Sequence, residues 1–173
     1  MVPNPDSPAS PPGGGRALGP MHLVQSFVNT LSADADLLRT REEAAAWLRT
    51  AALLPAEAGL SNSEHAALLR LRESIRDVLA AHVDGREDAA AAARLTRALA
   101  EGRLVVTVDP ASTVRLASAA RASYPGLVAA VAIAIAGSAA SGTWLRLKCC
   151  PAPDCGQAFY DSAETGRCSR HGA

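Results

Sequence analysis

The chain has very few aromatic residues, no excess of charge of either sign and no long apolar segment. Aromatic residues make up 3% of its 173 residues although 49% are hydrophobic, so a core must be built from Ala, Leu and Val. The 17 basic residues balance the 17 acidic ones, so nucleic acid or a membrane surface would have to be met by a local patch. The apolar stretch at 127–136 is shorter than the roughly 20 residues that cross a bilayer, so we expect no membrane partner.

Recognisable catalytic and targeting motifs are also missing. The sequence has no phosphate-binding loop, nucleophile elbow or dinucleotide fingerprint, and we therefore expect a protein that is not an enzyme. Residues 1–20 hold six Pro and four Gly and lack the apolar stretch of a signal peptide. This segment is expected to be a disordered leader, because it has almost nothing to bury. With no export signal, we expect reduced cysteines and a cytoplasmic location.

Helical patterns dominate residues 21–142, which we predict to form one domain. Apolar residues recur at helical spacing from 22 to 31, and two capping boxes, Thr40-Arg-Glu-Glu43 and Ser61-Asn-Ser-Glu64, open the next two helices. An Ala-rich helix is expected at about 87–101. The last helix, at 127 to about 138, is apolar throughout, which indicates that it is buried at the centre.

Between the last two helices the apolar period changes to that of a strand. Residues 104–108 and 113–116 alternate around the turn residues Asp109-Pro-Ala-Ser, a pattern that predicts one β-hairpin. We take 143–173 as a separate C-terminal module that begins with a short strand or connector at 144–148. The predicted fold class is α+β, mainly α: a helical domain with one hairpin, followed by a small zinc finger.

All four cysteines lie near the C-terminal end, where one of the four histidines follows them. The spacing Cys150-x4-Cys155-x12-Cys168-x2-His171 supplies three thiolates and an imidazole, a set that tetrahedral Zn²⁺ binds in structural sites. Disulfide or redox roles remain open alternatives. Cys149 replaces Cys150 if the register slips, and His171 is a candidate fourth ligand that the spacing does not settle.

Motifs along the chain resemble a bacterial family with an N-terminal ABATE domain and a C-terminal CGNR-type zinc finger, described as stress-induced transcription regulators. In the helical part the matching motifs are Phe27-Val-Asn-Thr-Leu31, Trp47-Leu48 and Leu71-Arg-Glu73, followed by the hairpin and the apolar helix. In the C-terminal part they are Cys150-Pro-Ala-Pro-Asp-Cys155-Gly156, Phe159 with Asp161, and Arg167-Cys168-Ser169.

The C-terminal part departs from the family pattern in three ways. The signature Cys-Gly-Asn-Arg, which carries the family's fourth ligand, is missing, and the corresponding position is Ala173. Arg167 stands where a Trp typically precedes the third cysteine. The loop between Asp161 and Cys168 is shorter and has fewer Arg, and the basic tail is absent. These changes affect DNA binding more than metal binding.

The resemblance implies a transcription regulator that binds DNA through its zinc finger, with the helical domain as sensor or dimerisation unit. Because a single finger binds DNA poorly, we expect a homodimer formed through the helical domain. The cations available in the module for DNA are Arg146, Lys148, Arg167 and Arg170. The alternative is a structural zinc module on a ligand- or protein-binding domain without DNA contact. In that case a small effector would meet the polar residues Asn29, Thr30 and Arg72 of the helical domain, which are otherwise ordinary capping and surface residues.

Overall fold

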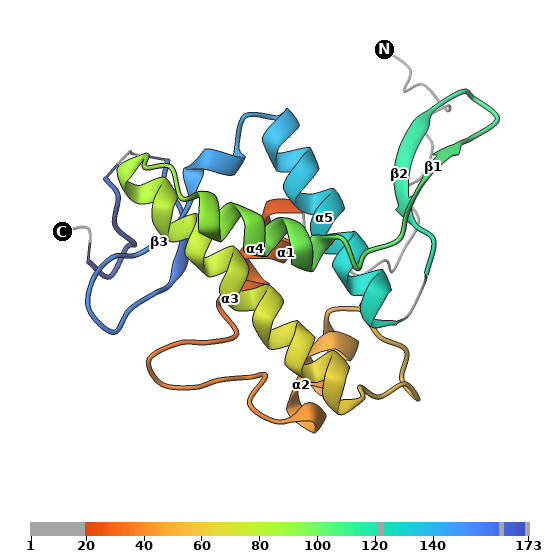
Figure 1. Cartoon of the computed structure of the whole chain (residues 1–173), viewed down its shortest axis with the longest axis horizontal. Helices are drawn as coiled ribbons and strands as arrows, with labels where there is room; N and C mark the ends of the chain where they lie inside the picture. The colour runs from red at the N-terminus through yellow and green to blue at the C-terminus, as the bar shows by residue number, and fades with distance from the viewer. Residues whose placement is uncertain (1–19, 121–122, 163–164, 172–173) are drawn as a thin grey trace, which may run out of the picture.

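The computed structural model describes residues 20–120, 123–162 and 165–171 (Figure 1). The predicted leader, residues 1–20, lies outside this part of the chain except for Pro20. The elements, in chain order, are α1 (Pro20–Val28), α2 (Arg41–Thr50), α3 (Asn62–Asp84), α4 (Ala89–Leu99), β1 (Leu104–Val108), β2 (Val114–Ser118), α5 (Tyr124–Ala140), the 3-10 turn η1 (Trp144–Arg146), β3 (Leu147–Cys149) and β4 (Ala158–Tyr160). The mainly helical α+β class is confirmed, with a second short hairpin, β3–β4, that the sequence pattern did not reveal.

Both predicted capping boxes are present and set the starts of α2 and α3. The Thr40 hydroxyl accepts a hydrogen bond from the Glu43 amide at 3.1 Å, while the Glu43 carboxylate accepts one from the Thr40 amide at 2.9 Å. Ser61 and Glu64 repeat this exchange at 3.2 and 2.8 Å. Each pair satisfies two backbone donors that the first helical turn leaves without partners. Helix α3 then runs to Asp84, where Gly85 adopts the left-handed conformation that ends it.

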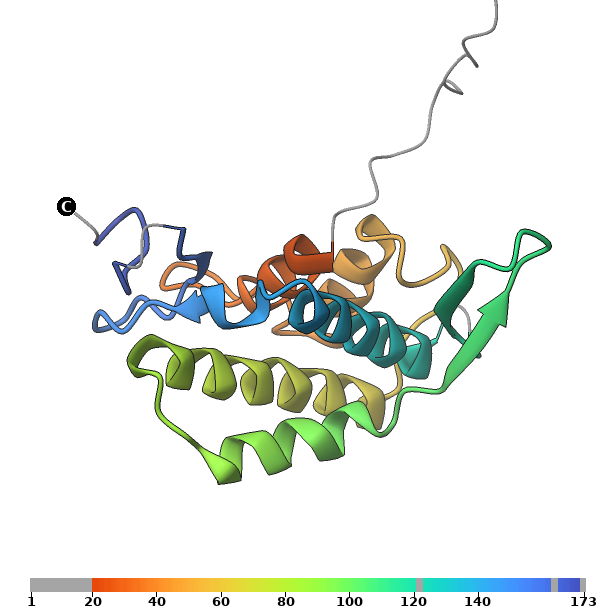
Figure 2. The same cartoon turned by 90° about the horizontal axis from the view of Figure 1, so that it is seen from above.

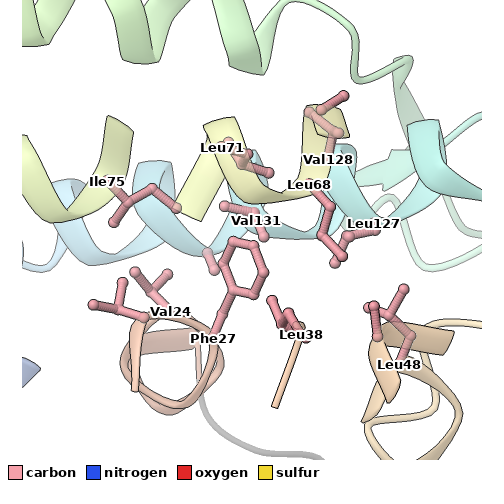
Figure 3. Packing of buried hydrophobic residues seen from close by; sticks show 14 of the residues in the cluster. Val24, Phe27, Leu38, Leu48, Leu68, Leu71, Ile75, Leu127, Val128 and Val131 are labelled. Atoms are coloured by element: carbon pink, nitrogen blue, oxygen red, sulfur yellow. The ribbon is translucent and has the colours of Figure 1, made fainter. Parts of the chain in front are cut away.

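The main core lies where α1, α3 and α5 meet (Figure 3). Phe27 of α1 and Leu71 of α3 are completely buried there. Val128 and Val131 of α5 are also completely buried, which confirms that the apolar helix is central. With so few aromatic side chains available, aliphatic residues fill most of this space. Within the described residues, none of the helices has the length and apolar character needed to cross a membrane.

The β1–β2 hairpin projects from one end of the molecule (Figures 1 and 2). Its strands are antiparallel, with Leu104 opposite Ser118 and Val108 opposite Val114. The hairpin touches the body mainly through contacts of β2 with α5. The C-terminal module lies at the opposite end of the molecule (Figure 2).

Strands β3 and β4 join the C-terminal module to the helical body. They pair antiparallel, with Leu147 opposite Tyr160 and Cys149 opposite Ala158. Leu147, Cys149 and Ala158 are buried in the main core together with residues of the helices. Residues of the predicted C-terminal module therefore contribute to the core of the helical part.

Candidate metal centre

The first pair of candidate ligands lies on the loop that connects β3 to β4. The Cys150 amide donates to the Gln157 carbonyl at 2.9 Å, which closes the loop, and the Cys155 amide donates to the Ala152 carbonyl at 3.1 Å, which forms a tight turn inside it. Gly156 has a φ of 53°, a left-handed conformation that glycine adopts at little cost. Cys150 and Cys155 are thereby brought to the same side of the loop.

The second pair, Cys168 and His171, lies on a turn near the end of the described chain. The His171 amide donates to the Cys168 carbonyl at 2.9 Å, so the two side chains are held three residues apart on one turn. The Cys168 side chain is buried and the His171 side chain is partly exposed. This turn faces the β3–β4 loop, so each pair supplies two of the four candidate ligands.

The four side chains converge on one point. The Nδ1 atom of His171 is 3.3 Å from the Cys168 sulfur and 3.5 Å from the Cys150 sulfur, and the sulfurs of Cys155 and Cys168 are 3.8 Å apart. All four ligand atoms lie within 4.8 Å of one another. Around a tetrahedral zinc ion, bonds of about 2.3 Å to sulfur and about 2.0 Å to nitrogen give edges of about 3.8 Å between sulfurs and about 3.5 Å between sulfur and nitrogen. The cluster therefore fits a tetrahedral metal ion.

The structure separates the adjacent thiols Cys149 and Cys150. Cys149 points into the main core, where burial raises its pKa to about 12 and keeps it a neutral thiol. Cys150 faces Cys168 and Phe159 in a second, small cluster. Burial opposes ionisation of Cys150, but hydrogen bonds from the amides of Cys168 and Ala152 outweigh it and lower its pKa to about 6. Because the thiolate is the form that binds metal, Cys150 is the member of the pair suited to the site. All four cysteines are free of disulfides.

A buried carboxylate organises the loop that leads to Cys168. Asp161 is 3% exposed, and its oxygens accept hydrogen bonds from the amides of Thr165 and Gly166, each at 2.9 Å. It also forms an ion pair with Lys148 at 2.9 Å. Burial would raise the pKa of Asp161, but the Lys148 ammonium and the two amides lower it. The carboxylate therefore stays ionised and ties the loop to β3.

Gln25 of α1 and Asn29, which directly follows α1, bind the backbone of β4. The Asn29 amide group donates to the Ala158 carbonyl at 2.9 Å and accepts from the Ala158 amide at 2.7 Å, so it pairs with this residue as a neighbouring strand would. Gln25 donates to the same carbonyl at 3.2 Å. The sequence marks Asn29 only as a candidate for ligand binding and does not single out Gln25, because no local pattern marks partners more than 100 residues away.

Arg76 of α3 is the second connection between the helical body and this module. Its guanidinium donates to the carbonyls of Gly156 at 2.7 Å, Val28 at 2.9 Å and Leu31 at 3.1 Å. Gly156 directly follows the candidate ligand Cys155, and a Cβ at Gly156 would collide with this guanidinium. Arg76 thus holds the first ligand loop against the end of α1.

The other two candidates for effector binding, Thr30 and Arg72, form a buried network. Arg72 is 4% exposed and forms an ion pair with Asp36 through two hydrogen bonds, at 2.6 and 3.1 Å. It also donates to Thr30 at 3.3 Å and to Glu73 at 2.9 Å. The hydrogen bond from Arg72 is the main cause that lowers the pKa of Asp36. These contacts hold the loop after α1 in place. They also show that the polar groups of Thr30 and Arg72 make hydrogen bonds within the protein.

A cleft of about 240 Å³ lies beside the cysteine cluster. One wall is the segment after α1, including Asn29 and Ser32, and the other is formed by the ligand loops, including Asp154, Arg170 and His171. Of the three residues predicted for an effector, only Asn29 lines this cleft.

The four cations predicted to contact DNA are in different situations. Arg146, Arg167 and Arg170 are exposed, and the last two flank Cys168 in sequence. Lys148 has a side chain only 16% exposed, and its ammonium is bound to Asp161. Because this ion pair neutralises it, Lys148 is removed from the set of candidate phosphate contacts.

Fold and site together define a class: a helical domain with a projecting hairpin, joined to a small module whose three cysteines and one histidine are placed to bind a metal. Residues 21–142 match the ABATE family, described as "putative stress-induced transcription regulator". The chain belongs to this family, as the motifs of its helical part predicted. The match ends before the cysteine cluster, for which the CGNR-type relationship stays a prediction. No curated protein matches the chain.

Proposed function

We propose that the cluster holds Zn²⁺ as a structural ion and that the module around it contacts DNA in a cytoplasmic transcription regulator. In this proposal the helical domain is the sensor or dimerisation unit. The observation that carries it is the convergence of four ligand atoms within 4.8 Å at the end of an ABATE-family chain.

The ligand chemistry supports zinc as the ion and a structural role for it. Three thiolates and an imidazole fill a tetrahedral coordination sphere, and structural zinc sites are closed in this way. A catalytic zinc needs an open position for water or substrate. Thiolate donation also leaves the ion a weak Lewis acid. We therefore propose that the protein is not an enzyme.

Metal content of the purified protein tests this assignment. We expect one zinc per chain by mass spectrometry of the metal, and loss of most of it in Cys155→Ser and His171→Ala. Cys149→Ala is a matched control, because it removes a neighbouring buried thiol that lies outside the cluster and should leave zinc content unchanged. Full zinc retention in Cys155→Ser would reject the site, and retention in His171→Ala alone would reject the fourth ligand.

Three exposed arginines support contact with DNA. Arg167 and Arg170 flank the ligand Cys168, and Arg146 immediately precedes β3, so ordering of the module by metal would fix them relative to one another. If each neutralises one phosphate, the logarithm of the binding constant should fall with the logarithm of salt concentration at a slope of about −2.7. A contact of this size binds weakly, so two modules in a homodimer would be needed for useful affinity.

Fluorescence anisotropy with a labelled DNA duplex at low salt measures this contact. Replacing Arg167 and Arg170 by Glu should abolish binding. A control with the same charge change, Arg97→Glu with Arg103→Glu, reverses exposed arginines of α4 and of the connection to β1 and should weaken binding only slightly. No binding at low salt, or equal losses in both variants, would reject the DNA contact.

The charge of the module favours a second candidate, a structural zinc module on a domain that binds a small effector or a protein. Three thiolates around Zn²⁺ leave a net charge of about −1 at the site, and Lys148 is neutralised by Asp161. The cleft beside the cluster would then receive a small polar effector between Asn29 and Arg170. In this case the Glu variants of Arg167 and Arg170 would leave protein partners bound, and the zinc-loaded protein would not bind DNA.

A further inference from the structure

The projecting β1–β2 hairpin has an apolar surface that the other described residues leave exposed. Residues opposite one another in an antiparallel pair share a face, and the register therefore places Val106 with Leu116 and Val108 with Val114. Val106, Val108 and Val114 are 63%, 64% and 65% exposed. Leu104 at the base of the same face is 43% exposed. We call this face, made of Leu104, Val106, Val108, Val114 and Leu116, the ribbon face.

Such a surface is costly for an isolated protein. A two-stranded hairpin alone is marginally stable in water, and soluble proteins usually guard open strands with charges or a covering element. Here the hairpin forms a sheet of only two strands, so both of its outer edges are open within the described residues. Its strands carry one charged residue, Arg115, which lies on the other face. The ribbon face is therefore built to be covered.

We propose that the ribbon face is the dimerisation surface of this protein, with the ribbon faces of two copies packed against each other about a two-fold axis. This dimer rests on the proposed function, which requires a homodimer, and it specifies the surface through which the two copies meet.

Composition identifies a second copy as the occupant. The ribbon face carries no charge, so a partner surface must be apolar and uncharged as well. Among the described residues, five of the nine large apolar side chains that are exposed belong to the ribbon face, and the others are Val105 on the opposite face, Leu37, Leu145 and Tyr160. Within the part of the chain that the structure describes, the surface that matches the ribbon face is therefore a second ribbon face.

The size of the ribbon face sets the strength of association. Two strands about 4.8 Å apart, five residues long at about 3.3 Å each, present a face on the order of 150–200 Å², against about 800 Å² per partner in a stable complex. Burial of two such faces contributes at most about 10 kcal/mol, from which association removes at least about 4 kcal/mol. We therefore expect a weak dimer, with a dissociation constant on the order of hundreds of micromolar, that separates on dilution. The C-terminal module lies at the other end of the molecule (Figure 2), so it stays free in this dimer.

Sedimentation equilibrium of the full zinc-loaded chain, over concentrations from about 1 µM to about 500 µM, tests the proposal. The test variant is Val106→Thr with Val114→Thr, which keeps β-branched side chains of nearly the same shape but replaces four methyl groups per dimer by hydroxyls. Both residues lie outside the core, and circular dichroism confirms folding. The matched control is Leu145→Gln, which removes an apolar side chain that is 67% exposed elsewhere.

The wild-type protein and the control should dimerise alike, and the double variant should bind at least roughly 100-fold more weakly. Hydrogen exchange of residues 104–118 should slow as protein concentration rises. A wild-type protein that stays monomeric at the highest concentration would overturn the proposal. So would a dimer that the double variant leaves unchanged, or one that the control weakens equally. Because no DNA is present, these results are independent of the DNA titration above.

Discussion

Replacing Arg76 by Ala tests the connection between the helical body and the candidate metal site. The substitution removes hydrogen bonds from a charged donor to the carbonyls of Gly156, Val28 and Leu31. A hydrogen bond involving a charged group contributes about 1.5–3 kcal/mol, but the side chain is 17% exposed, so water can replace part of the loss. We expect the free energy of unfolding to fall by about 3 kcal/mol. The ion pair with Glu73, at 3.6 Å, adds little.

The same substitution should weaken zinc binding, because Gly156 is next to the ligand Cys155. Loss of a contact that orients a ligand typically reduces metal affinity by about 10–100-fold. Competition against a chromophoric chelator measures the affinity, and denaturant unfolding of the metal-free protein measures stability separately.

Two further variants make the Arg76 experiment specific. Arg76→Lys should recover part of both losses, since an ammonium reaches fewer carbonyls than the guanidinium fork. Arg94→Ala removes an arginine whose ion pair with Asp77 is about half exposed, and it should cost less than about 1 kcal/mol and leave zinc affinity unchanged. If Arg76→Ala unfolds at the same denaturant concentration as Arg94→Ala and binds zinc equally well, the contacts of Arg76 do not position the ligand loop.

The remaining predictions concern single contacts of the body. Burial lowers the pKa of His82 in the folded protein. The free energy of unfolding should therefore fall as the pH drops below about 6.5, the pKa of histidine in the unfolded chain. In acid titrations monitored by circular dichroism, His82→Gln should reduce this dependence of stability on pH. Asn29→Ala removes the paired hydrogen bonds to Ala158, and denaturant unfolding should show a loss of about 2 kcal/mol. A Cβ at Gly102 would lie 2.8 Å from backbone of α5, so Gly102→Ala should cost about 1–3 kcal/mol. Gly59→Ala, with nothing within 4 Å, is its control and should change stability by less than about 1 kcal/mol. An unchanged pH dependence in His82→Gln would contradict the role given to His82. An unchanged unfolding midpoint in Asn29→Ala or in Gly102→Ala would contradict the contact that each of these variants tests.

Local patterns predicted the elements well where neighbours in sequence make the decisive contacts. The capping boxes at Thr40 and Ser61 exchange hydrogen bonds over three residues, and the sequence shows both partners at once. The predicted hairpin strands at 104–108 and 113–116 agree with β1 and β2 to within two residues. The last helix begins at Tyr124, three residues before the predicted start, because Ser123 caps it and Pro125 is tolerated in its first turn.

The β3–β4 hairpin and its attachment to α1 could not be predicted in this way. Three-residue strands are too short to show alternation, and here both faces of β3 and β4 meet protein. The Asn29 contact joins residues 129 positions apart, and the Arg76 contact to Gly156 joins residues 80 positions apart. In the sequence, Arg76 has the pattern of an exposed arginine, because its helix also carries acidic residues that could pair with it on the surface.

The sequence alone determined the ligand types, their spacing and the helical class, since these follow from chemistry within a few residues of each other. Which of the two adjacent thiols faces the site was decided only by the tertiary structure, because it depends on what packs around each of them. Cys149 ends β3 and is buried in the main core, while Cys150 begins the loop after β3 and meets Cys168. Folding likewise decided that Lys148 is neutralised by Asp161, since the charge left to contact a partner depends on what each side chain meets in space.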